Sequence, residues 1–113
     1  MDFQRGDVVR VNLGSIKNGI VGSEQAFTRP CIILQTFHHL DLVTIIPLTT
    51  RNKDYMSSTS LFLIKGTGGL AHDSFALCHQ LRTISQDRII EKLGTLSAEE
   101  FNALIMVVKN IFF

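Results

Sequence analysis

The sequence predicts a mainly β domain with one C-terminal α-helix, folded as a small, strongly bent barrel. Three observations predict this fold class. Apolar and polar residues alternate over most of the chain, turn signals separate these short runs, and helical spacing appears only in the last third. Short strands joined by long loops must protect their edges, which favours a barrel over an open sheet.

The size and composition of the chain indicate one domain, residues 1–113. Of its 113 residues 45% are hydrophobic, and its formal net charge is +1. A chain of this length can form one core, although so small a core gains from a partner. The near-zero charge excludes a global field that attracts nucleic acid or anionic lipid. Any polyanion must therefore be bound through the local placement of the 11 Lys and Arg residues.

Cysteine usage and hydropathy favour a cytoplasmic protein. Cys31 and Cys78 provide no disulfide framework and no C-x-x-C spacing, which fits a reducing compartment. The first residues, "MDFQRGDVVRVNL", lack the apolar run of a signal peptide, and no stretch approaches the length of a membrane span. The histidines and cysteines show no metal-ligand spacing, so we expect neither a metal nor a cofactor.

Three strands are expected in the first half of the chain. Residues 7–13, "DVVRVNL", alternate as a half-buried strand does, and a long polar excursion follows over 14–28. Residues 30–37 and 42–49 form the next two strands, joined by a short turn. Pro47 cannot donate to a ladder, so the third strand is expected to end or bulge there.

The second half begins with two more strands and then changes character. Residues 58–64, "STSLFLI", and 74–84, "SFALCHQLRTI", are the fourth and fifth strands. Ser85 can cap a short helical turn over 86–91, "QDRIIE", and residues 92–96 read as a brief extended piece.

The last element is an amphipathic helix of roughly three to four turns. Ser97 and Glu100 have the spacing of a capping box, which predicts that the helix begins there. Its apolar residues recur at helical spacing and predict a face against the core or a dimer interface. These residues are Phe101, Leu104, Ile105 and Val108.

Several short motifs have ordinary explanations. Arg5-Gly6-Asp7 stands before a strand and reads as turn chemistry. The stretch "KGTGG", residues 65–69, lacks the Gly-Lys-Ser/Thr of a phosphate-binding loop and reads as a connector. His79 lies on an alternating stretch, where a histidine is more often packed or at the surface than a metal ligand.

Five stretches in order resemble the MazF/PemK family of toxin endoribonucleases. They are "RGDVVRVNL", "GSEQAFTRPCIIL", "TIIPLTT", "GLAHDSFALCHQLRTI" and "DRIIEKLGTLSAEEF", and they cover nearly the whole chain. The resemblance implies an SH3-like barrel of the MazF/PemK/CcdB toxin type, a homodimer, and metal-independent cleavage of single-stranded RNA, such as mRNA, at short sequences. It also implies inhibition by a cognate antitoxin whose flexible tail lies across the active groove.

The resemblance assigns catalytic roles to Arg29 and Thr49. Arg29 matches the arginine of the family's "R-P" step, and Thr49, rather than Thr50, matches its catalytic threonine. A planar guanidinium can hold two phosphate oxygens, and Pro30 restricts the backbone of Arg29 to extended conformations. A guanidinium keeps its proton at neutral pH, so Glu24, the one acid in the matched loop, is the local candidate for a general base. A solvated loop carboxylate is the equal alternative for Glu24.

Other matched residues are candidates for RNA contacts. Phe27 can stack on a base, although packing under its own loop is the alternative. Three residues depart from the family pattern and bear on the RNA sequence that is recognised. Many relatives have an uncharged residue in place of Arg51, an acid is common in place of His79, and the third departure is Phe27. The arginines of this surface also predict an acidic antitoxin tail. The candidate RNA-binding residues are Ser23, Gln25, Phe27, Thr28, Thr50, Arg51, Gln80 and Arg82.

Two other functions are compatible with the same fold. One is a binding module that poisons DNA gyrase through its terminal helix, which gives no use to Arg29 or Thr49. The other is a nuclease-dead scaffold for the antitoxin. Both catalytic positions are intact, which favours the endoribonuclease.

Overall fold

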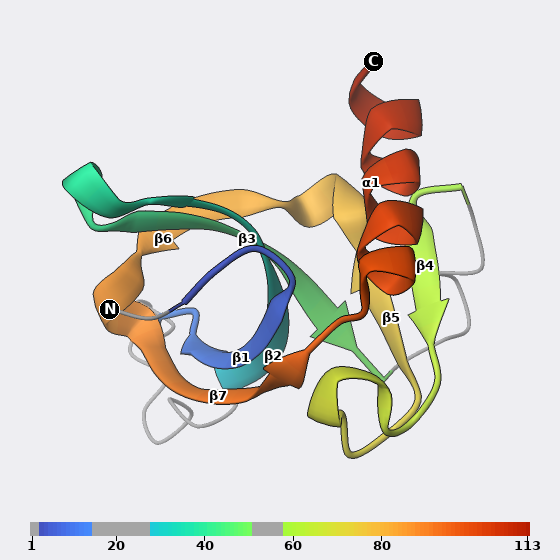
Figure 1. The fold of residues 1–113 in the computed structure, drawn as a ribbon, viewed down its shortest axis with the longest axis horizontal. Helices are drawn as coiled ribbons and strands as arrows, with labels where there is room; N and C mark the ends of the chain where they lie inside the picture. The colour runs from blue at the N-terminus through green and yellow to red at the C-terminus, as the bar shows by residue number, and fades with distance from the viewer. Residues whose placement is uncertain (1–2, 15–27, 51–57) are drawn as a thin grey trace, which may run out of the picture.

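The computed structural model describes residues 3–14, 28–50 and 58–113. In these residues an antiparallel sheet bends around on itself and one α-helix packs beside it (Figure 1). The predicted fold class, mainly β with a C-terminal helix, is confirmed. The strands are β1 (Asp7–Asn12), β2 (Thr28–Phe37), β3 (Leu42–Thr49), β4 (Ser60–Leu63), β5 (Ser74–Leu77), β6 (Arg82–Ser85) and β7 (Ile89–Thr95), and the helix is α1 (Ala98–Phe112).

The expected barrel is strongly bent but is not closed by hydrogen bonds. The strand order is β4-β5-β3-β2-β1-β7, with β6 paired to β3, and no ladder between described residues joins the two ends of this path. Strands β6 and β7 are linked instead through the short 3₁₀ helix η5 (Gln86–Arg88). The ring of strands is therefore completed by the segment of chain between β6 and β7 rather than by a ladder of hydrogen bonds.

The fifth predicted strand, residues 74–84, is two strands in the structure. The 3₁₀ helix η4 (Cys78–Gln80) separates β5 from β6. The cause is a change of partner along β3, which pairs with β6 at Leu42 to Ile45 and with β5 at Leu48 and Thr49. Neither ladder includes Pro47, whose missing N–H is tolerated at this gap. The prediction that β3 ends or bulges at Pro47 is therefore wrong.

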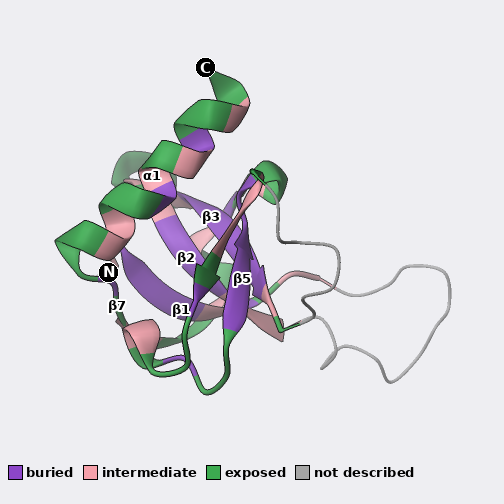
Figure 2. Cartoon of the chain, turned by 90° about the vertical axis from the view of Figure 1, so that its right-hand side faces the viewer, coloured by how far each residue is buried: buried purple, intermediate pink, exposed green. Residues whose placement is uncertain are grey.

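Two hydrophobic cores lie on opposite faces of the sheet. The first, the helix-side core, joins Val8, Ile32 and Ile46 to Leu104 and Val108 of α1. The other, the strand-only core, takes all its fully buried residues from strands. Because Val8 belongs to one core and Val9 to the other, β1 is covered on both faces at its start, which differs from the half-buried strand that the sequence predicts. Farther along β1 the prediction holds, since Val11 is buried and Asn12 is exposed. Figure 2 shows this burial in the central strands, while α1 leaves much of its surface exposed. The strand-only core comprises Val9, Val11, Cys31, Ile33, Val43, Ile45 and Ile84.

The Arg5-Gly6-Asp7 motif is a turn, as the sequence suggests. Gly6 has a φ of +91°, which is a conformation that glycine adopts easily. The side chain of Asp7 is fully buried and accepts hydrogen bonds from the Gln4 amide at 3.0 Å and the Thr95 hydroxyl at 3.1 Å. Lys92 adds an ion pair at 3.4 Å. The motif therefore joins the start of β1 to β7.

Both predicted caps in the C-terminal third are present. Ser85 accepts a hydrogen bond from the Asp87 amide, but only η5 is helical, and the rest of the expected turn belongs to β7. Ser97 and Glu100 form the capping box of α1, with hydrogen bonds of 3.0 and 2.7 Å. No helix among the described residues has the length and apolar character needed to cross a membrane.

Candidate active site

The structure describes six of the eleven residues that the sequence nominates. Thr28 and Arg29 begin β2, Thr49 ends β3, Thr50 follows it, Gln80 lies in η4 and Arg82 begins β6. The remaining nominated residues lie outside the described ranges. They are Ser23, Glu24, Gln25, Phe27 and Arg51.

The register of β2 and β3 brings Arg29 and Thr49 together. Cys31 lies opposite Pro47, and Ile32 lies opposite Ile46. Continuing this register by two residues beyond Cys31 places Arg29 opposite Thr49. Directly opposed residues project from the same face of an antiparallel pair. The guanidinium and the hydroxyl therefore share one face, at the point where β2 begins and β3 ends.

Arg82 joins the same face from a third strand. It lies opposite Ile45 in the pairing of β3 with β6, and Ile45 and Thr49 alternate onto one side of β3. Burial raises the pKa of the Cys31 thiol to about 12, while the positive charges of Arg29 and Arg82 act in the opposite direction. The charges of two guanidiniums therefore both lower the pKa of one buried thiol, which lies at the end of the strand-only core. The thiol stays protonated at neutral pH, so Cys31 does not serve as a nucleophile.

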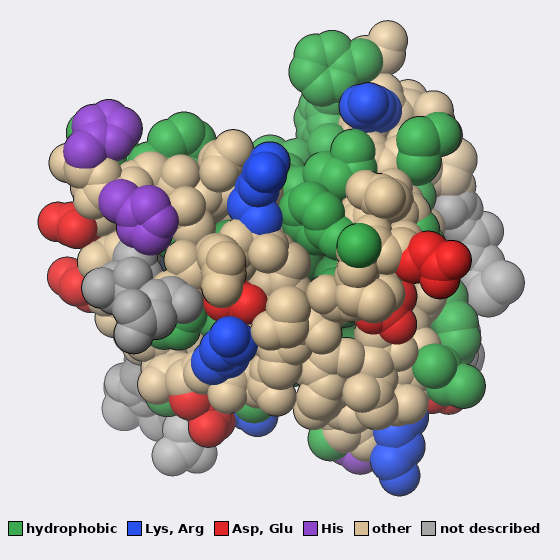
Figure 3. All heavy atoms as spheres, viewed as in Figure 1, with side chains coloured by type: hydrophobic (Ala, Val, Ile, Leu, Met, Phe, Trp, Pro, Cys, Tyr) green, Lys and Arg blue, Asp and Glu red, His purple; other side chains and the backbone are tan. Residues whose placement is uncertain are grey.

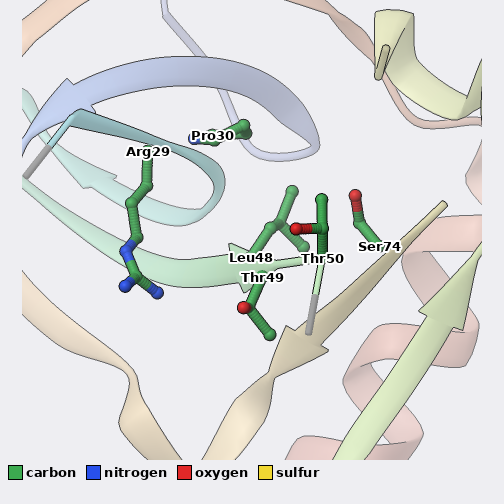
Figure 4. A pocket seen from close by; sticks show the side chains of 6 residues that line it. All are labelled: Arg29, Pro30, Leu48, Thr49, Thr50 and Ser74. Atoms are coloured by element: carbon green, nitrogen blue, oxygen red, sulfur yellow. The ribbon is translucent and has the colours of Figure 1, made fainter. Parts of the chain in front are cut away.

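A pocket of about 230 Å³ lies at these strand ends. Strand alternation divides its lining into two rows, as Figure 4 shows. The side chains of Arg29 and Thr49 extend to one side of the strands, and those of Pro30, Thr50 and Ser74 extend to the other. Thr49 and Thr50, although adjacent in sequence, therefore face different surroundings.

The charge of this site suits an anion. No carboxylate of the described residues forms an ion pair with Arg29 or Arg82. A half-buried guanidinium beside a threonine hydroxyl offers a planar pair of donors and one neutral donor, which matches the oxygens of a phosphate. Within the described part of the chain, no cluster of His, Cys, Asp and Glu has the arrangement of a metal site.

Gln80 and Ser74 differ from what the sequence suggests. Gln80 is exposed in η4 and does not line the pocket. Its amide lies 3.4 Å from the ring of His79, which is likewise exposed. Ser74 lines the pocket but is not among the nominated residues. The signal that identifies Ser74 is the pairing of Thr49 with Phe75 in β5, which only the fold reveals.

Comparisons with known proteins agree on one family. The model of the family described as "PemK-like, MazF-like toxin of type II toxin-antitoxin system" matches residues 4–112. Endoribonuclease MazF of Staphylococcus saprophyticus is 32% identical over 98 residues, which are 84% of this chain and 78% of that protein.

Solved structures show the same fold. The Mycobacterium tuberculosis toxin MazF-mt6 is similar with a TM-score of 0.73 and 24% identity, over 94% of this chain and 95% of that one. An endoribonuclease from a mycobacterial species, solved in complex with its cognate antitoxin, has a TM-score of 0.73 and 18% identity, over 96% of this chain and 92% of that one. At these identities the likeness concerns the fold.

Proposed function

The chain belongs to the PemK-like, MazF-like family of toxins of type II toxin–antitoxin systems, and from this premise we propose how it acts. It is an endoribonuclease homologue that cleaves single-stranded RNA at short sequences, with the 2′-hydroxyl of the RNA as the nucleophile. The observation that carries this proposal is that Arg29 and Thr49 line one pocket and extend to the same side of the ends of β2 and β3 (Figure 4).

The proposed reaction is a transfer within the RNA. The 2′-oxygen attacks the adjacent phosphorus and gives up its proton, while the bond from phosphorus to the 5′-oxygen breaks and that oxygen takes up a proton. The products are a 2′,3′-cyclic phosphate and a 5′-hydroxyl end. Negative charge builds on the non-bridging oxygens in the transition state, where Arg29 and Thr49 donate to them. Preorganised donors of this kind are worth roughly a hundred- to thousandfold in rate.

The guanidinium of Arg29 is excluded as the general base that takes the proton of the 2′-hydroxyl. A guanidinium offers donors and no acceptor, so the role of Arg29 is electrostatic and donating. Glu24, outside the described residues, remains the candidate base for the 2′-hydroxyl. Arg82 shares the face of Arg29 and supports binding of a neighbouring phosphate.

The proposed partners follow from the same site. The substrate is single-stranded RNA in the cytoplasm, and the inhibitor is a cognate antitoxin, as in the mycobacterial complex that this fold resembles. Two copies of the chain, in a homodimer, would place two such sites along one RNA-binding groove.

The test is cleavage of a long single-stranded RNA by the purified chain in excess EDTA. We expect cuts at a short recurring sequence, with 5′-hydroxyl and cyclic phosphate ends mapped by primer extension and end-specific ligation. Cleavage that appears only after a divalent metal is restored would overturn the mechanism. Absence of cleavage under both conditions would favour the scaffold or the gyrase-binding module instead.

A further inference from the structure

A second pocket, of about 280 Å³, continues from the first. The two pockets share Pro30, Thr50 and Ser74, which are the row that faces away from Arg29 and Thr49 in Figure 4. The second pocket therefore lies on the other side of the strand ends and is reached directly from the candidate active site. Its remaining lining comes from Arg10 of β1, Leu93 of β7 and the segment 69–72.

Glycines build the far wall of this pocket. The 3₁₀ helix η3 (Thr67–Gly69) lies with its backbone directly against β7. A Cβ at Gly69 would collide with the carbonyl of Leu93, and one at Gly94 would lie 2.5 Å from the carbonyl oxygen of Gly68. Only glycine allows this approach. The "KGTGG" stretch, which the sequence presents as a connector, therefore holds the segment 69–72 beside β7.

The lining combines an apolar floor with a polar rim. Leu70, only 4% exposed, and Leu93 provide apolar surface. At the rim, the Ser74 hydroxyl donates to the carbonyl oxygen of His72 at 2.9 Å, which fixes the backbone that carries the imidazole. The Arg10 guanidinium donates to Glu91 at 3.0 Å, so its charge is already balanced.

This chemistry suits a nucleobase better than a phosphate. A base presents two apolar faces and a polar edge, whereas a phosphate requires uncompensated positive charge. The ring of His72 and the guanidinium plane of Arg10 are both surfaces on which RNA bases stack.

We propose that the second pocket receives the base of a nucleotide beside the cleaved bond, with His72 helping to select that base. The inference rests on the proposed function and deepens it. The phosphate is held on the Arg29–Thr49 side, and the chain of the RNA passes the shared row so that a neighbouring base enters the second pocket. His72 is then a specificity-determining residue that does not touch the reacting atoms.

The test combines two variants with one control. His72→Ala removes the ring, and Ala71→Phe fills the pocket from a position that is exposed and absent from the lining of the first pocket. His39→Ala changes an exposed histidine in the 3₁₀ helix η2 (His38–Leu40), outside both pockets. Affinity is measured with an RNA that carries a 2′-deoxy sugar at the cleaved nucleotide, and the cleaved sequences are mapped on a long RNA.

We expect His72→Ala to bind the uncleavable RNA roughly five- to tenfold more weakly, the lower end of the range for losing one stacked base. It should also relax the base preference at one position flanking the cut. Ala71→Phe should weaken binding at least as much, and His39→Ala should match the wild type in both measurements.

Unchanged affinity and cleavage sequence in both pocket variants would overturn the inference while leaving the nuclease intact. Weaker antitoxin binding with unchanged RNA binding would also overturn it, because the pocket would then serve a protein ligand. Failure of the wild type to cleave RNA would instead reject the proposed function itself. Circular dichroism of each variant separates these outcomes from misfolding.

Discussion

Arg29 combines a fixed charge with a restricted backbone. Pro30 disfavours the helical region for the residue before it, and β2 holds Arg29 in an extended strand. A guanidinium held in this way loses little freedom when it binds a phosphate, so its donors are ready for the charge of the transition state. The residue supports little of the core, because it is only half-buried and lies at the start of its strand.

Arg29→Ala should therefore reduce RNA cleavage by at least roughly a hundredfold without unfolding the protein. Arg29→Lys should restore little, because an ammonium keeps the charge but loses the planar fork. The measurement is the single-turnover cleavage rate in EDTA, with circular dichroism as the folding control. Wild-type cleavage by a folded Arg29→Ala protein would remove the residue from the mechanism.

Thr49 and Thr50 provide a matched pair at the same strand end. Thr49→Ala removes a hydroxyl from the face of Arg29, whereas Thr50→Ala removes one from the opposite face. The first should slow cleavage clearly, though less than Arg29→Ala because the lost donor is neutral, and the second should have a milder effect. Cleavage rates of the two variants decide the point, and a larger loss for Thr50→Ala would show that the register argument fails.

The sequence reveals these residues only as separate candidates. Arg29 and Thr49 are twenty positions apart, and they meet in one pocket because β2 pairs with β3 up to Cys31 and Pro47. Ser74 and His72 reach the same region only because β5 pairs with the end of β3. Register is set by tertiary packing and loop length, which a single sequence does not specify.

At the scale of elements, local chemistry predicts starts and stops better than it predicts partners. The caps at Ser85 and Ser97 are present because each depends on neighbours within three residues. The break in residues 74–84 depends on the change of partner along β3, which alternation of apolar residues does not encode. The same limitation applies to Val8 of β1, which alternation places on the more polar face of the strand but which the helix-side core buries.

The contact of η3 with β7 can be tested by one methyl group. Gly94→Ala would place a Cβ against the backbone of Gly68, which cannot move as a side chain does. We expect a loss of about 1–3 kcal/mol in the free energy of unfolding, the usual cost of overpacking. Urea denaturation measures it, with Ile90→Thr at an exposed position of the same strand as the control. A Gly94→Ala protein as stable as the wild type would contradict the close approach.

At the scale of the whole molecule, apolar side chains remain exposed on α1 and β4. Phe62, Ile64, Met106 and Phe112 are each exposed by about half or more, and Phe113 fully. Figure 3 shows hydrophobic side chains gathered over the helix. A pocket of about 270 Å³, lined largely by apolar residues, lies between α1 and β4. A domain of this size gains stability by covering such surface.

We therefore predict a twofold homodimer at micromolar concentration, in which part of this surface is covered. Sedimentation equilibrium should give about twice the chain mass of 12.6 kDa. Met106→Glu, which places a charge on the exposed face of α1, should weaken the dimer if the helix contributes to the interface. A wild-type chain that sediments as a clean monomer at this concentration would refute the dimer.

The antitoxin is expected to use the same charges as the RNA. Arg29 and Arg82 have no ion-pair partner among the described residues. Their guanidinium groups can therefore bind carboxylates as readily as phosphates. We predict a partner segment that is acidic, carries large apolar residues at intervals, and orders only on binding. Such a segment excludes RNA by occupying the Arg29–Thr49 face.

Competition provides the measurement. An acidic antitoxin segment should displace the uncleavable RNA from the wild-type chain, and its affinity should fall as the salt concentration rises, because exposed charges are screened. Arg82→Ala should weaken the binding of both the RNA and the antitoxin segment, since both would lose a contact with the same guanidinium. His39→Ala should change neither affinity. Simultaneous binding of intact antitoxin and RNA at one site would show that inhibition does not act through these arginines.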